Sequence, residues 1–189
     1  MSKNTLYSPE RIILGLDPGT NIMGYGIIGA AGKKMKLAEL GVMNMSKLDD
    51  HHLKLKMIFE QTLGLIEQHK PDEIAIEAPF FGKNVQSMLK LGRAQGVAIA
   101  AGLFRNIPVT EYSPRKIKQS ITGNGNASKE QVSGMICKLL SLSEKPKYLD
   151  STDALAVAMC HYFQRGTTTN EKNYGGWKGF LKENPGRKK

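Results

Sequence analysis

The chain has 189 residues, of which 40% are hydrophobic and 23% charged, a composition typical of a folded globular domain. The net charge of +10 favours a polyanionic partner, with nucleic acid ahead of an anionic membrane surface. No apolar run approaches the ~20 residues that span a bilayer, and the N-terminus lacks a signal-peptide pattern. We therefore expect a cytoplasmic protein with no membrane association.

The first 45 residues predict three antiparallel strands. Apolar, β-branched runs place the strands near residues 11–17, 23–28 and 36–45. Turn signals follow the first strand at residues 17–20 and the second at residues 31–33, and Leu40-Gly41 marks a further turn. These runs predict an antiparallel meander.

Helices and strands alternate in the rest of the chain. We expect a helix over 50–68, a strand over 72–77, a helix over 85–104 and a strand over 109–112. Ser113 and Ser128 are predicted N-caps of two further helices, and a last helix begins at Asp150 or Ser151 and runs through His161. This order predicts an α/β fold with a mixed five-stranded sheet, three antiparallel strands and then parallel ones, covered by helices on both faces.

Two segments are expected. Residues 1–164 form the folded domain, and residues 165–189 form a basic, disordered tail with seven Lys or Arg and two Glu. Tyr174, Trp177 and Phe180 give this tail aromatic side chains that could dock on another surface.

Acidic residues stand at three informative places. Asp17 and Glu77 each end an apolar strand, where exposure at the strand end or a salt bridge is the simpler explanation for either one alone. Asp150 and Asp153 share one face at the start of a helix, where an N-cap and the helix dipole would account for them. If the three places converge, the acids repel one another unless cations lie between them, and Mg²⁺ is the usual cation beside phosphate. An acidic cluster in a basic protein is what a metal-dependent nuclease needs.

Four motifs, in order, resemble those of the RuvC family of Holliday junction resolvases. They are residues 13–20 (ILGLDPGT) with Gly24-Tyr25-Gly26, residues 76–84 (IEAPFFGKN), residues 91–96 (LGRAQG) and residues 150–156 (DSTDALA). The resemblance covers about residues 11–164. The sequence departs from the family at Ala78-Pro79, where relatives commonly have Gln and an apolar residue, and at Asp150, where some relatives have His.

The resemblance implies an RNase H-like fold and an endonuclease that resolves four-way DNA junctions in recombination and repair. It implies a catalytic and metal-binding set of Asp17, Glu77, Asp150 and Asp153, with two Mg²⁺ per site and Mn²⁺ as a substitute. Paired symmetric nicks would leave 5′-phosphate and 3′-hydroxyl ends. Implied partners are four-way junction DNA, a second copy of the chain in a homodimer, and the RuvA–RuvB branch-migration complex.

Further residues are candidates for DNA contacts. The set is Phe80, Lys83, Asn84, Arg115, Lys118 and Lys129. Phe80 matches the family's junction-contacting aromatic, although a core position would also explain it. Lys118 and Lys129 match family lysines near the scissile bond, whereas a solvated helix face is the alternative. Gly92 and Gly96 imply a close neighbour of their helix, either the sheet beneath it or a partner helix.

Three other functions compete with this interpretation. Actin-like ATPases open with a similar Asp-x-Gly-Thr hairpin, but they need two large domains for which 189 residues leave no room. A junction-binding protein without chemistry would not need all four acids. Another RNase H-like nuclease could cleave RNA or an RNA–DNA hybrid, but Phe80 and residues 91–96 favour a junction.

Overall fold

A five-stranded mixed sheet forms the centre of the protein in a computed structural model that describes residues 8–79, 84–142, 146 and 149–166. The strands are β1 (Arg11–Asp17), β2 (Ile22–Ala31), β3 (Lys34–Asn44), β4 (Glu73–Glu77) and β5 (Val109–Tyr112). Their spatial order is β3-β2-β1-β4-β5. The first three strands pair antiparallel, whereas β4 runs parallel to both β1 and β5, as the sequence predicts.

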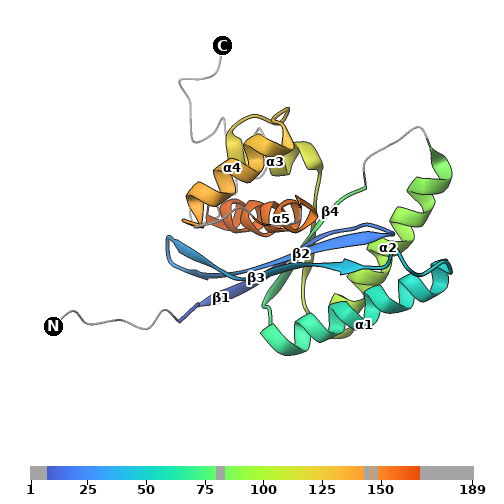
Figure 1. The fold of residues 1–189 in the computed structure, drawn as a ribbon. Helices are drawn as coiled ribbons and strands as arrows, with labels where there is room; N and C mark the ends of the chain where they lie inside the picture. The colour runs from blue at the N-terminus through green and yellow to red at the C-terminus, as the bar shows by residue number, and fades with distance from the viewer. Residues whose placement is uncertain (1–7, 80–83, 143–145, 147–148, 167–189) are drawn as a thin grey trace, which may run out of the picture.

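Helices cover both faces of this sheet (Figure 1). They are α1 (His51–His69), α2 (Val85–Phe104), α3 (Pro114–Thr122), α4 (Lys129–Leu139) and α5 (Leu149–Gly166). One face carries α1 and α2; the other carries α5, with α3 and α4 packed over it. Ser113 caps α3 and Ser128 forms a capping box with Gln131 at α4, which confirms both predicted helix starts.

The sheet separates two apolar cores. Alternate side chains of a strand point to opposite faces, so Ile13 of β1 joins the core under α5, while Leu14 and Leu16 join the core under α1 and α2. All three side chains are fully buried. A central strand covered on both faces has to be apolar throughout, which explains why the charge of Asp17 appears only where β1 ends.

Two predictions of local structure need correction. Leu40-Gly41 is no turn but lies inside β3, because Gly41 makes room for the ring of Tyr25 on the neighbouring strand. A Cβ at Gly41 would lie 2.5 Å from the Tyr25 hydroxyl oxygen. The last helix extends beyond His161 to Gly166, two residues past the predicted domain boundary at 164. Residues 167–189, the rest of the predicted tail, lie outside the described residues, so the division of the chain stays a prediction.

Within the part of the chain that the structure describes, no helix combines the length and the apolar character needed to cross a bilayer.

Candidate metal centre

Asp17 and Glu77 lie at the same edge of the sheet. Their strands β1 and β4 are parallel neighbours, with Leu16 paired to Ile76 one residue before the two acids. Parallel neighbours end on the same side, so both carboxylates emerge together where the apolar strands stop. The two acids are therefore neighbours in space and not two separate strand ends.

The helix α5 brings Asp150 and Asp153 to that edge. It lies close against β1 and β2 because Gly15 and Gly24 present no side chain toward it: a Cβ on Gly24 would lie 2.0 Å from the carbonyl oxygen of Asp150. Gly24 is also the register partner of Asp17. The backbone of Asp150 therefore lies directly over the strand pair that ends in Asp17.

The three aspartates form a cluster of possible metal ligands. One carboxylate oxygen from each of Asp17, Asp150 and Asp153 lies within 4.8 Å of the others. Glu77 lines a cavity of about 110 Å³ together with Asp17 and Asp153, so all four predicted acids meet at this place. Clustered carboxylate oxygens are the donor set of hard divalent cations, and the residues present fit Mg²⁺ or Mn²⁺.

Burial and mutual repulsion disfavour the ionised acids. Desolvation, followed by the charges of Glu77 and Asp153, raises the pKa of Asp17 from 3.8 to about 8. Desolvation and the charge of Asp153 raise the pKa of Glu77 from 4.5 to about 7. A cation between these carboxylates would favour their charged forms. The raised pKa values of Asp17 and Glu77 are therefore consistent with a cluster that binds a divalent cation.

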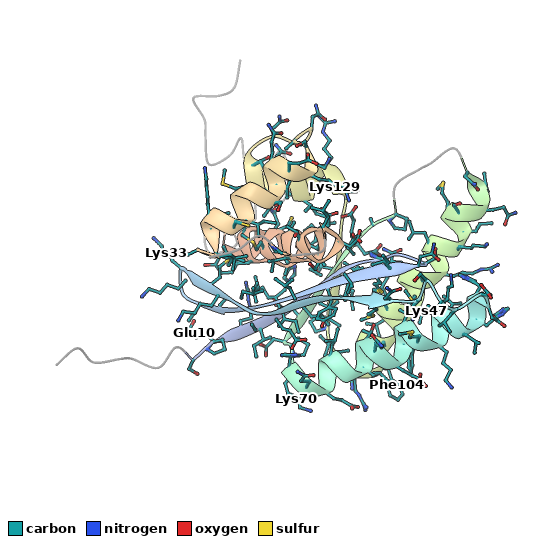
Figure 2. All side chains as sticks on the ribbon, in the orientation of Figure 1. Glu10, Lys33, Lys47, Lys70, Phe104 and Lys129 are labelled. Carbon is teal, nitrogen blue, oxygen red and sulfur yellow. The ribbon has the colours of Figure 1, made fainter. Side chains whose placement is uncertain are left out.

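Two lysines border the acids. Lys129 Nζ donates to Asp153 Oδ2 over 2.5 Å, and this hydrogen bond raises the pKa of Lys129. Lys118 lines the same cavity as Glu77. Figure 2 shows Lys129 on the α5 side of the sheet. The sequence suggested that Lys129 contacts DNA, but nothing in its spacing indicated an ion pair with an acid 24 residues away.

Two other residues predicted to contact DNA lie within the described part of the chain. Asn84 caps α2, since its side chain accepts a hydrogen bond from the Ser87 backbone N–H. Arg115 is exposed on α3, and its side chain packs beside Gly125. Phe80 and Lys83 lie outside the described residues. A role in DNA binding stays a prediction for all of these residues, as it does for Lys118 and Lys129.

Gln95 is a residue of the site that sequence reasoning missed. Its side-chain amide, buried on α2, donates to Glu111 Oε2 at 2.7 Å and to the backbone carbonyl of Glu77 at 3.3 Å. These bonds connect α2 to the end of β4 that carries Glu77. A signal was available in the sequence. The helical period of residues 85–104 places Gln95 toward the core, where its polar amide needs a hydrogen-bond partner.

The raised pKa of Asp17 predicts how pH affects stability. Between about pH 4 and pH 8 the folded state keeps a proton that the unfolded state has released, so the free energy of unfolding of the metal-free protein falls as pH rises. We expect Asp17→Asn to flatten this fall and to raise the melting temperature at pH 8. Thermal denaturation in EDTA across this range measures both effects. The exposed Asp49→Asn is the control, and equal pH slopes for Asp17→Asn and the unaltered chain would contradict the raised pKa.

Comparisons with known proteins agree with this geometry. Residues 13–161 match the family model described as crossover junction endodeoxyribonuclease RuvC. The chain is 59% identical over 189 residues to the RuvC of Cytophaga hutchinsonii, covering 100% of this chain and 94% of that protein. It is 56% identical over 182 residues to the RuvC of Bacteroides fragilis, covering 95% of this chain and 97% of the relative. A solved structure, T. thermophilus RuvC in complex with Holliday junction substrate, superposes with a TM-score of 0.77 at 30% identity, covering 84% of this chain and 98% of that one.

Proposed function

The chain belongs to the RuvC family of crossover junction endodeoxyribonucleases and has its RNase H-like fold, and from this premise we propose that it resolves four-way DNA junctions at the cluster of Asp17, Glu77, Asp150 and Asp153. The observation that carries the proposal is the convergence of acids from β1, β4 and α5, with three carboxylates within 4.8 Å. Paired symmetric nicks would leave 5′-phosphate and 3′-hydroxyl ends.

The four acids would hold the divalent metal of the reaction. Two Mg²⁺ ions, or Mn²⁺ in their place, would activate the attacking water and stabilise the leaving oxygen of the phosphodiester. The side chains of this protein supply what that chemistry requires: oxygen ligands on three separate elements and a partly buried site. The raised pKa values of Asp17 and Glu77 mean that metal binding would release protons.

Lysines around the acids would hold the DNA backbone. Lys129 lies against Asp153, and Lys118 lines the cavity, so both cations are within the reach of a phosphate bound at the cluster. Lys129 would then share its charge between Asp153 and the phosphate. We assign the remaining contacts of the junction to Arg115, to Asn84, and to Phe80 and Lys83, which follow β4 in the sequence.

A homodimer would give the protein two sites for two symmetric strands. Support comes from α2: among the described residues, and apart from the helix's own neighbouring backbone, no atom lies within 4 Å of the position of a Cβ on Gly92 or Gly96. The sheet is therefore not the close neighbour of these glycines. Apolar side chains are exposed nearby along the chain: Val85 and Leu89 on α2 are 65% and 53% accessible. We propose that a second copy of the chain covers this face. We also propose that the enzyme acts on four-way junctions in the cytoplasm, together with the RuvA–RuvB complex.

Substrate selectivity tests the proposed function. We expect the purified protein in Mg²⁺ to cut a synthetic four-way junction in two strands, at symmetric positions, and much faster than a linear duplex of the same sequence. An RNA–DNA hybrid of equal length should stay intact. Single-turnover cleavage of end-labelled substrates measures all three rates, and ligation of the nicked products checks for 5′-phosphate ends.

The same assay separates the competing functions. Faster cleavage of the hybrid would identify a nuclease of RNA–DNA duplexes. Tight junction binding with no cleavage in Mg²⁺ or Mn²⁺ would identify a junction-binding protein without chemistry. Equal rates on the junction and the linear duplex would contradict the assignment to junctions.

A further inference from the structure

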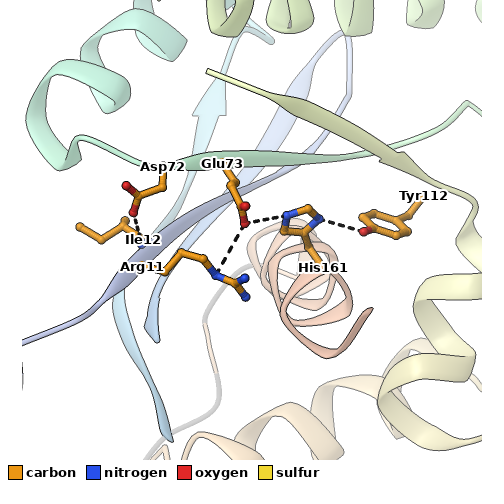
Figure 3. Close-up of polar contacts among 6 residues, drawn as sticks. All are labelled: Arg11, Ile12, Asp72, Glu73, Tyr112 and His161. Carbon is orange, nitrogen blue, oxygen red and sulfur yellow. Dashed lines mark hydrogen bonds and ion pairs between the residues drawn. The ribbon is translucent and has the colours of Figure 1, made fainter. Parts of the chain in front are cut away.

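A buried polar network joins α5 to three strands at the end of the helix opposite the acids (Figure 3). His161 of α5 lies between two partners: its Nε2 is 2.9 Å from Glu73 Oε2, and its Nδ1 is 2.8 Å from the Tyr112 hydroxyl. Arg11 Nε lies 3.6 Å from the same Glu73 oxygen. His161 and Glu73 are only 2% and 5% exposed, so these polar groups depend on one another.

The chemistry of the groups fixes one bond of the network. A carboxylate only accepts, so His161 Nε2 donates to Glu73, while Nδ1 forms a second hydrogen bond with the Tyr112 hydroxyl. The guanidinium of Arg11 balances the charge of Glu73 and also lies over the ring of Tyr162 on α5, 5.9 Å from the ring centroid. β1, β4 and β5 are thereby each connected to the C-terminal half of α5.

The polar network and the acid cluster both connect α5 to β4. Glu73 and Glu77 point to one face of β4 and are four residues apart, a separation of about 13 Å along a strand. Asp153 and His161 are eight residues apart on α5, or about 12 Å along a helix. The helix therefore lies beside β4 at both ends of the strand, once through the hydrogen bond of His161 to Glu73 and once at the acid cluster.

Apolar packing and directional bonds hold α5 in different ways. Gly15 and Gly24 let the helix approach the sheet closely, and the side chains of Ile13 and Ile28 share one apolar core with it. Apolar contacts are not directional, so they resist a small rotation or slide of the helix less sharply than a hydrogen bond does. Directional hydrogen bonds at His161 oppose both displacements.

We propose that His161 is a positioning residue, which holds α5 against β4 and β5 through Glu73 and Tyr112 so that the carboxylates at the other end remain converged before metal binds. The proposal rests on the proposed metal site. The network lies about 12 Å along α5 from that site, so it would act through the helix and not by contact with metal or substrate.

Mn²⁺ affinity measured by electron paramagnetic resonance tests this role without depending on cleavage. We expect His161→Gln to weaken Mn²⁺ binding about tenfold, as substitution of groups that orient metal ligands commonly does. Tyr112→Phe removes one hydroxyl and keeps the ring, so it should fold and weaken binding in the same direction by a smaller factor. The control is Ile58→Ala on α1, which lowers the melting temperature from the opposite face of the sheet and should leave Mn²⁺ affinity unchanged.

Each outcome decides between named alternatives. Unaltered Mn²⁺ affinity in a folded His161→Gln protein overturns the positioning role, as does an equal loss of affinity in Ile58→Ala at a matched loss of thermal stability. If His161→Gln does not fold, Tyr112→Phe decides alone, and unaltered affinity in it overturns the proposal. Absence of Mn²⁺ binding by the unaltered chain would instead contradict the metal site of the proposed function.

Discussion

We expect Asp17→Asn to abolish cleavage of a synthetic four-way junction in Mg²⁺ while leaving junction binding largely intact. Asp17 belongs to the group of three carboxylates within 4.8 Å, and it is the one to which both Glu77 and Asp150 are electrostatically coupled. Its loss removes a metal ligand worth several kcal/mol of transition-state stabilisation, which corresponds to a rate reduction of about 10³-fold or more. Asparagine keeps the size of the side chain.

Binding and folding must be measured beside the rate. Single-turnover cleavage gives the rate, gel mobility shift in Ca²⁺ or EDTA gives the affinity for the junction, and thermal denaturation reports on the fold. Lys56→Ala on the opposite face of the protein is a control that should change none of them. Loss of junction binding together with unfolding would mean that Asp17 is a structural residue, and cleavage at the unaltered rate would remove it from the metal site.

The second large effect is expected from Gly24→Ala, which adds one methyl group and replaces none of the predicted ligand residues. The new Cβ would lie 2.0 Å from the carbonyl oxygen of Asp150 and 3.3 Å from the Cβ of Ala154. Backbone atoms cannot rotate out of the way, so the start of α5 has to move by more than about 1 Å to restore a normal contact distance. A displacement of that size at reacting groups costs about 10²-fold in rate.

Single-turnover junction cleavage measures this loss, and circular dichroism verifies that the helices remain. Gly64→Ala provides a matched control on α1, because within the described part of the chain no atom beyond the helix's own neighbouring backbone lies within 4 Å of the position of its Cβ. Removing a helical glycine there should raise stability by up to about 1 kcal/mol and leave the rate unchanged. A Gly24→Ala enzyme that is folded and cleaves at the unaltered rate would show that α5 tolerates the added group, contrary to the close packing.

The sequence by itself determined the elements and the identity of the four acids. The period of the apolar residues predicted the strands and helices, and Ser113 and Ser128 marked the starts of two helices. Such signals can be recognised in the sequence because they depend on residues within one element. They placed Asp17 and Glu77 at strand ends and Asp150 and Asp153 on one helix face. The prediction of a turn at Leu40-Gly41 was wrong, because a glycine that makes room for a ring on the next strand has the same local signature as a turn glycine.

Only the tertiary structure decided which side chains meet. The ion pair of Lys129 with Asp153, the bond from Gln95 to Glu77 and the contact of His161 with Glu73 join residues 24, 18 and 88 positions apart. No repeat or cap within an element encodes such pairs, because they form when packed surfaces bring distant segments together and a buried polar group must find a partner there. The acids could be identified along the chain, whereas their convergence, and the groups that hold them converged, depended on how α5 packs across the sheet.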